Sequence, residues 1–146
     1  MKKYLPKTSG FTLVELLVVV AIIAILAIIG IAIFSGLQPR ARDATRKSDL
    51  EAISKAMETQ YVESTAQYAA LAATFFAGGT IPTDPLNGTT TCQSNTCKYC
   101  VRTSNGNCTT TDTTVAAGQP PAGTSYRVCT NLEQGTPTFL CYASQR

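Results

Sequence analysis

Residues 11–34 read FTLVELLVVVAIIAILAIIGIAIF, and this segment decides the fold of the 146-residue chain. Glu15 is its only charged residue, and the stretch from Leu16 to Phe34 carries no charge. As a helix, that stretch would be about 28 Å long, close to the hydrocarbon core of a bilayer at about 30 Å. It is apolar on every side, and the rest of the chain is too small and polar to surround it. The sequence therefore predicts a membrane-spanning helix.

The preceding residues, MKKYLPKTSG, are basic, as they are in a secretory signal. A cleavable secretory signal has an apolar run of about 7–15 residues, followed by small residues at the cut. Here the apolar run is longer, no such site follows it, and the small residue Gly10 precedes it. This pattern excludes an ordinary secretory signal.

Glu15 lies near the start of the predicted span. A carboxylate inside a membrane is costly unless it is neutralised or paired. In one interpretation Glu15 lies at the interface, where the positive end of the helix dipole favours it. In the other it pairs with a positive group on another copy of the chain. A free α-amino group would serve if the chain were cut near Gly10.

The segment Gly10–Leu16, GFTLVEL, with its basic leader and the aliphatic run behind it, resembles the N-terminal signal of type IV pilins and of type II secretion pseudopilins. The resemblance implies that a prepilin peptidase cuts between Gly10 and Phe11 and methylates the new amine of Phe11. It also implies that Glu15 pairs with the N-terminal amine of a neighbouring subunit during assembly. No cofactor is implied.

The resemblance further implies a homo-oligomer in the form of a helical filament, built by an inner-membrane assembly platform with its ATPase. Before assembly, the subunit would cross the bilayer once, with its leader in the cytoplasm and its C-terminal domain outside. Afterwards it would lie in an extracellular pilus or a periplasmic pseudopilus. Two alternatives stay open: a pseudopilin of a type II secretion system, and a single-span membrane anchor with a disulfide-bonded binding domain. The anchor has no need of Gly10, Phe11 and Glu15.

Gly30, Gly36 and Pro39 lie around the end of the apolar run. Proline removes a hydrogen-bond donor from a helix, and glycine has a low helix propensity. These residues predict a kink or local melting of the helix.

Apolar residues recur at three- and four-residue spacing between Ala41 and Ser64, which predicts a helix with one buried face. One helix is thus expected from about Thr12 to about Glu63. The buried face consists of Leu50, Ile53, Met57 and Tyr61. A basic cluster at the start of this half is expected to be solvated and to pair with acids of neighbouring subunits. It consists of Arg40, Arg42, Arg46 and Lys47.

Residues 65–146 are rich in Thr, Gly, Asn and Pro, which is typical of loops and short strands. A short helix is expected over 68–77 and a long polar loop over 104–123. A hairpin centred on Gly135 would place Cys129 opposite Cys141 and turn Val128 and Tyr142 toward the helix. The strands are expected at Cys97–Thr103, Ser125–Leu132 and Thr138–Ser144.

The predicted fold is α+β: a long N-terminal helix packed on a small antiparallel sheet and stabilised by disulfides. The predicted segments are a leader (1–10), a transmembrane or filament-core half-helix (11–34), an amphipathic half-helix (35–64) and a globular head with a three-stranded antiparallel sheet (65–146).

An even number of cysteines, six, in a small exported domain predicts disulfides. Counting alone allows fifteen pairings. The hairpin register favours Cys129–Cys141. The next preferences are Cys100–Cys108, around the turn Ser104-Asn105-Gly106, and then Cys92–Cys97. The alternatives make Cys97-Lys98-Tyr99-Cys100 half of a zinc site or a redox motif. The zinc site is disfavoured because the chain has no second Cys-x-x-Cys pair and no histidine. The redox motif is disfavoured because no thioredoxin-like βαβ pattern flanks it.

The chain has no His, which excludes Ser-His-Asp and Cys-His catalysis. No acid pair or metal cluster is evident, so no enzyme is predicted. Some pseudopilins bind calcium after an Asp-Pro pair such as Asp84-Pro85, but the acids after Glu63 are far apart, so Asp84 is expected to shape its turn. The net charge of +3 arises from the lysines of the leader, Lys2, Lys3 and Lys7. Without them the charge is balanced, and no specific nucleic-acid partner is inferred.

Overall fold

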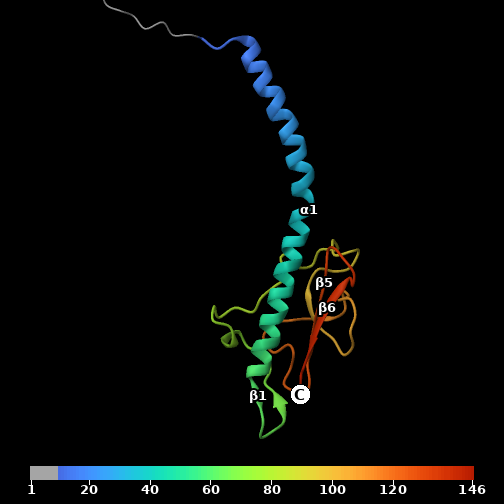
Figure 1. Ribbon diagram of the computed structural model, residues 1–146. Coiled ribbons are helices and arrows are strands. Elements are labelled where there is room, and N and C mark those ends of the chain that lie inside the picture. The colour runs from blue at the N-terminus through green and yellow to red at the C-terminus, as the bar shows by residue number, and fades with distance from the viewer. Residues whose placement is uncertain (1–9) are drawn as a thin grey trace, which may run out of the picture. The chain divides into compact units, whose positions relative to one another are not determined.

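The computed structural model describes residues 10–146, which form two compact units divided between Leu37 and Gln38. Helix α1 (Leu13–Thr59) begins in the first unit and ends in the second (Figure 1). The predicted leader lies outside the described residues except for Gly10. Helix α1 is continuous through Gly30, Gly36 and Pro39, so the local melting considered above is not observed. The kink stays a prediction.

Helix α1 ends at Thr59, four residues before the predicted end at Glu63. The chain then forms a two-stranded hairpin of β1 (Tyr61–Val62) and β2 (Gln67–Tyr68). Tyr and Val favour strands over helices. The ring of Tyr61 also packs edge-on against that of Tyr68, with centroids 4.9 Å apart. This cross-strand contact explains why the helix stops early.

The short helix predicted over 68–77 is wrong for most of its length. Only a 3-10 turn, η1 (Ala73–Phe75), forms there. The backbone of Tyr68 instead exchanges two hydrogen bonds with that of Gly123, at 2.7 and 3.1 Å. The N–H of Leu71 donates to the carbonyl of Pro120. These bonds to a distant segment override the local helical spacing.

The head contains a four-stranded antiparallel sheet in the order β4-β3-β5-β6. The three predicted strands are present but shorter. The fourth strand corrects the expected three-stranded sheet, and it lies in the segment expected to be a polar loop. Its two threonines are good strand formers, and Val115 beside them is buried. The strands are β3 (Tyr99–Val101), β4 (Thr113–Thr114), β5 (Arg127–Asn131) and β6 (Phe139–Ala143).

Strands β5 and β6 pair in the predicted register, with Cys129 opposite Cys141 and Val128 opposite Tyr142. The apolar face of α1 between residues 50 and 57 packs against this sheet, as predicted. Burying each large apolar side chain contributes about 1.5–3 kcal/mol. The core consists of Leu50, Ile53, Met57, Tyr68, Leu71, Tyr99, Val115, Tyr126 and Val128.

Candidate processing and assembly site

The first turn of α1 is closed by Thr12 and Glu15. The carboxylate of Glu15 accepts hydrogen bonds from the N–H and the hydroxyl of Thr12, both at 2.8 Å. The hydroxyl oxygen of Thr12 accepts one from the N–H of Glu15, at 3.2 Å. This reciprocal arrangement is a capping box, which satisfies N–H groups that the first helical turn leaves free.

Sequence reasoning missed this cap, although the spacing Thr-x-x-Glu before an apolar run is its signature. Glu15 therefore has a partner within its own chain. The predicted pairing of Glu15 with the amine of a neighbouring subunit concerns two copies, and it stays a prediction.

The apolar part of α1 is exposed on all sides in the single chain. Every residue from Gly10 to Ser35 is exposed, and the side chain next to the predicted cut, Phe11, is 84% exposed. By length and composition, α1 can cross a membrane. An apolar surface of this extent marks a site covered by lipid or by other polypeptide.

Only part of the basic cluster of residues 40–47 is solvated, although the whole cluster was expected to be. Arg46 is fully buried, and its partners lie in its own chain. Arg42 also pairs within the chain, through Nε and Nη2 to both oxygens of Glu133, at 2.7 and 2.6 Å. The expectation that these two arginines pair with neighbouring subunits is therefore wrong. Arg40 and Lys47 stay exposed.

Three carboxylates surround the guanidinium of Arg46. Its Nε and Nη2 donate to the two oxygens of Asp84, while Nη1 donates to Asp43 at 2.8 Å and to Glu133 at 2.6 Å. Asp43 also accepts hydrogen bonds from the backbone N–H groups of Glu133 and Gln134. The network joins α1, the turn at Asp84 and the β5–β6 connection within the head.

The network shifts the pKa of Glu133 and that of Arg46. Hydrogen bonds from Arg42 lower the pKa of Glu133, and Arg46 adds to the effect. Burial acts to lower the pKa of Arg46, but its hydrogen bonds to Asp84 and Glu133 outweigh burial and raise that pKa. Glu133 and Arg46 are therefore charged at neutral pH, which suits a structural role rather than proton transfer.

Asp84 shapes its turn as expected, because its carboxylate accepts a hydrogen bond from the N–H of Leu86. The same carboxylate has Arg46 as a bidentate cationic partner. In residues 10–146, no group of three or more His, Cys, Asp or Glu side chains is placed to hold a metal ion. Asp84 thus has a structural role in this geometry.

All six cysteines form disulfides, in the pairs that the sequence favoured: Cys92–Cys97, Cys100–Cys108 and Cys129–Cys141. Cys97 and Cys100 belong to different bridges, so they are not the dithiol that a zinc or redox site needs. The last two bridges form one buried cluster on the sheet.

The family model for the prokaryotic N-terminal methylation motif matches residues 5–33 of the chain. This range contains the predicted cut, the capping box and the apolar run to Ile33. Neither the curated proteins nor the solved structures contain a significant match to the chain.

Proposed function

We propose that this chain, whose N-terminus carries the prepilin-type signal of type IV pilins and pseudopilins, is a structural subunit of a type IV pilus-like filament. The role is structural, not catalytic. The subunit polymerises through the apolar part of α1 after its leader has been removed.

One observation carries this proposal: the methylation motif coincides with a helix whose apolar surface is exposed all round. A simple membrane anchor explains the apolar surface but not the motif. In a filament, the helices would bury the same surface against each other, replacing their contacts with lipid. The heads, together with the amphipathic half-helix, would form the outer coat; from Gln38 onward, both belong to one compact unit.

The processing steps are carried over from the resemblance. A prepilin peptidase cuts between Gly10 and Phe11 and methylates the amine of Phe11. Glu15 then pairs with that amine on a neighbouring subunit.

The proposed segments are the leader (1–10), the filament-core half-helix (11–34), the amphipathic half-helix (35–64) and the head (65–146). Bending at Gly30, Gly36 and Pro39 would let the helix adapt in the filament.

The subunit first resides in the cell membrane, with the leader in the cytoplasm and the head outside. Its partners are the peptidase, an assembly platform with its ATPase, and copies of itself. The second candidate is a pseudopilin in a periplasmic pseudopilus, which the same motif favours equally.

The test is electron microscopy of filaments sheared from cells, with mass spectrometry of their subunits. The proposal expects filaments whose main component begins with N-methylated Phe11. A pseudopilin would carry the same modified N-terminus but stay in the cell envelope, and its deletion would abolish protein secretion. A chain that keeps residues 1–10 and never forms filaments would be a plain membrane anchor, which would contradict both candidates.

A further inference from the structure

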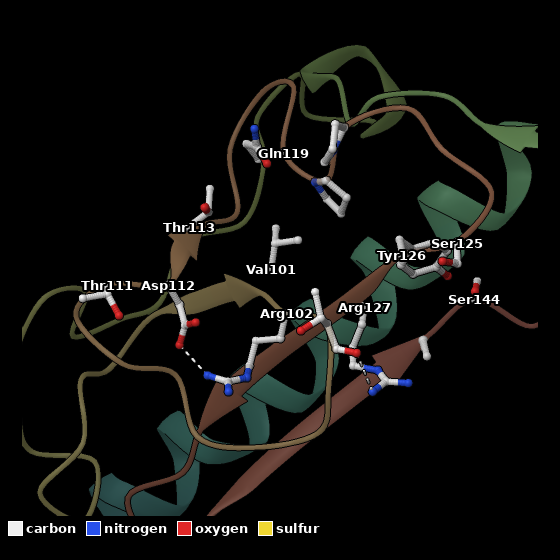
Figure 2. A pocket seen from close by; sticks show the side chains of 14 residues that line it. Val101, Arg102, Thr111, Asp112, Thr113, Gln119, Ser125, Tyr126, Arg127 and Ser144 are labelled. Carbon is white, nitrogen blue, oxygen red and sulfur yellow. Dashed lines mark hydrogen bonds and ion pairs between the residues drawn. The ribbon is translucent and has the colours of Figure 1, made fainter.

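We propose that the head binds an acidic sugar, a pyranose carrying one carboxylate, in a hollow at one end of the sheet. The hollow measures about 690 Å³ and lies between the ends of β3, β4, β5 and β6 and the segment 119–125 (Figure 2). This volume lies within the range of about 300–1,000 Å³ typical of small-molecule sites.

Two arginines and one aspartate line the hollow, so it has an excess of one positive charge. The charge of Arg102 is already paired within the chain, because its Nη1 donates hydrogen bonds to Asp112 and to the carbonyl of Asn107. Figure 2 shows its guanidinium directed toward Asp112. The excess charge is therefore that of Arg127.

Arg127 has unused donors. Its Nη1 makes one hydrogen bond of 3.4 Å, to the carbonyl of Thr103. Its Nε is buried, and it has no hydrogen-bond partner within the described part of the chain. A guanidinium has five N–H donors in a planar fork that matches a carboxylate. A buried donor without a partner costs free energy. A ligand is therefore favoured if the guanidinium of Arg127 can rotate to donate hydrogen bonds to it.

The remaining polar groups of the hollow suit a ligand with several hydroxyls. Five Ser and Thr side chains line it: Thr103, Thr111, Thr113, Ser125 and Ser144. Only Thr111 among them has a side-chain hydrogen bond within residues 10–146. In the view of Figure 2, Gln119 lies across the hollow from both arginines. Its amide both donates and accepts, as a hydroxyl-rich ligand requires.

The positive charge of Arg127 and the hydroxyl groups around it together favour an acidic sugar over a simple carboxylate and over a neutral sugar. A bare carboxylate would use Arg127 alone and leave the hydroxyl groups unused. A neutral sugar would leave the charge of Arg127 unpaired. Val101, Pro121 and Ala143, which are not fully buried, supply apolar surface for a pyranose ring.

The test is a titration of the full ¹⁵N-labelled chain in dodecylphosphocholine micelles, whose headgroup carries no sugar, with sodium glucuronate. The expected result is saturable shifts of the amide signals of Thr103, Thr113 and Arg127, with a dissociation constant on the order of 1 mM. Glucose, sodium acetate and N-acetylglutamate are titrated at equal ionic strength, and each should bind more weakly than glucuronate.

Arg127→Gln should weaken glucuronate binding by about tenfold. Arg127→Lys should recover only part of the loss, because a lysine lacks the fork. Thr113→Val should weaken glucuronate but leave the response to acetate unchanged. Lys47→Gln removes a charge on α1, which does not line the hollow, and should change nothing. Unchanged spectra of the free variants report intact folding.

Equal binding of acetate and glucuronate would overturn the sugar assignment. Tighter binding of N-acetylglutamate would overturn it in favour of an acidic polypeptide. Wild-type affinity in Arg127→Gln would overturn the site itself.

Discussion

Arg46 donates two parallel hydrogen bonds to the carboxylate of Asp84, at 2.8 and 3.0 Å, although 38 positions separate them in sequence. Both side chains are fully buried. A two-pronged contact of this kind fixes the orientation of both groups as well as their distance. The Nη1 atom of the guanidinium donates to Asp43 and Glu133, so one side chain holds α1, the turn at Asp84 and the β5–β6 connection in register.

Arg46→Met should be strongly destabilising. It leaves the carboxylates of Asp84, Asp43 and Glu133 buried without their shared partner. Breaking a buried ion pair on one side typically costs about 3–5 kcal/mol. The measurement is chemical unfolding of the full chain in detergent, followed by circular dichroism.

Lys47→Met is the matched control, because Lys47 is the exposed neighbour of Arg46. Its expected effect is within about 0.5 kcal/mol. Arg46→Lys should behave like Arg46→Met, since an ammonium group cannot make the two-pronged contact. Equal stability of Arg46→Met and Lys47→Met would show that the network contributes nothing.

The network should also make the head less stable in acid. Hydrogen bonds from Arg42 and Arg46 hold the pKa of Glu133 below its ordinary value. A lowered pKa in the folded state stabilises the fold above the pKa of the unfolded chain, about 4.3. That contribution is lost as the pH falls through the lower, folded pKa. The melting temperature should therefore drop below about pH 4.

Glu133→Gln tests the source of this acid sensitivity. The variant should be less stable at neutral pH, and its melting temperature should depend less on pH in the acid range. An acid profile as steep as that of the original chain would assign the sensitivity to other carboxylates.

Local rules predicted the parts of the fold that depend on near neighbours. The register of Cys129 with Cys141 follows from one turn and the two-residue alternation of strands, and the buried face of α1 follows from its spacing. The helix predicted over 68–77 failed because its backbone bonds go to residues 118–123, which no local pattern reveals.

In the candidate site too, the features that depend on near neighbours in sequence could be predicted, and those that depend on distant residues could not. Gly10, Phe11 and Glu15 lie within the contiguous motif at residues 5–33, so sequence alone is enough to propose their roles. The cap formed by Thr12 was also readable from its spacing. The burial of Arg46 could not be predicted from the sequence, because its partners Asp84 and Glu133 are 38 and 87 positions away. A run of basic residues ordinarily lies in solvent.

Disulfide mapping tests the pairing of the cysteines. Cys100 faces Cys129 across β3 and β5, so a different bridge between these strands is a near alternative. Trypsin cuts after Lys98, Arg102 and Arg127, which places Cys100 and Cys108 on separate peptides. Without reduction, the peptide 99–102 should be linked to 103–127. A link from 99–102 to the C-terminal peptide would reveal the alternative bridge, and the reduced digest is the control.

Glu15 has two separable roles, the cap seen in the single chain and the proposed pair with a neighbour's amine. Gln can replace Glu in a capping box, so Glu15→Gln keeps the cap and removes only the charge. Glu15→Ala removes both, and Thr12→Ala weakens the cap while keeping the charge. We expect both Glu15 variants to insert normally in the membrane but to yield few filaments, and Thr12→Ala to lose less. The measurement compares sheared filament yield with the amount of subunit in the membrane fraction. Normal filament yield from Glu15→Gln alone would leave capping as the function of Glu15, because the cap is the one interaction which that variant retains.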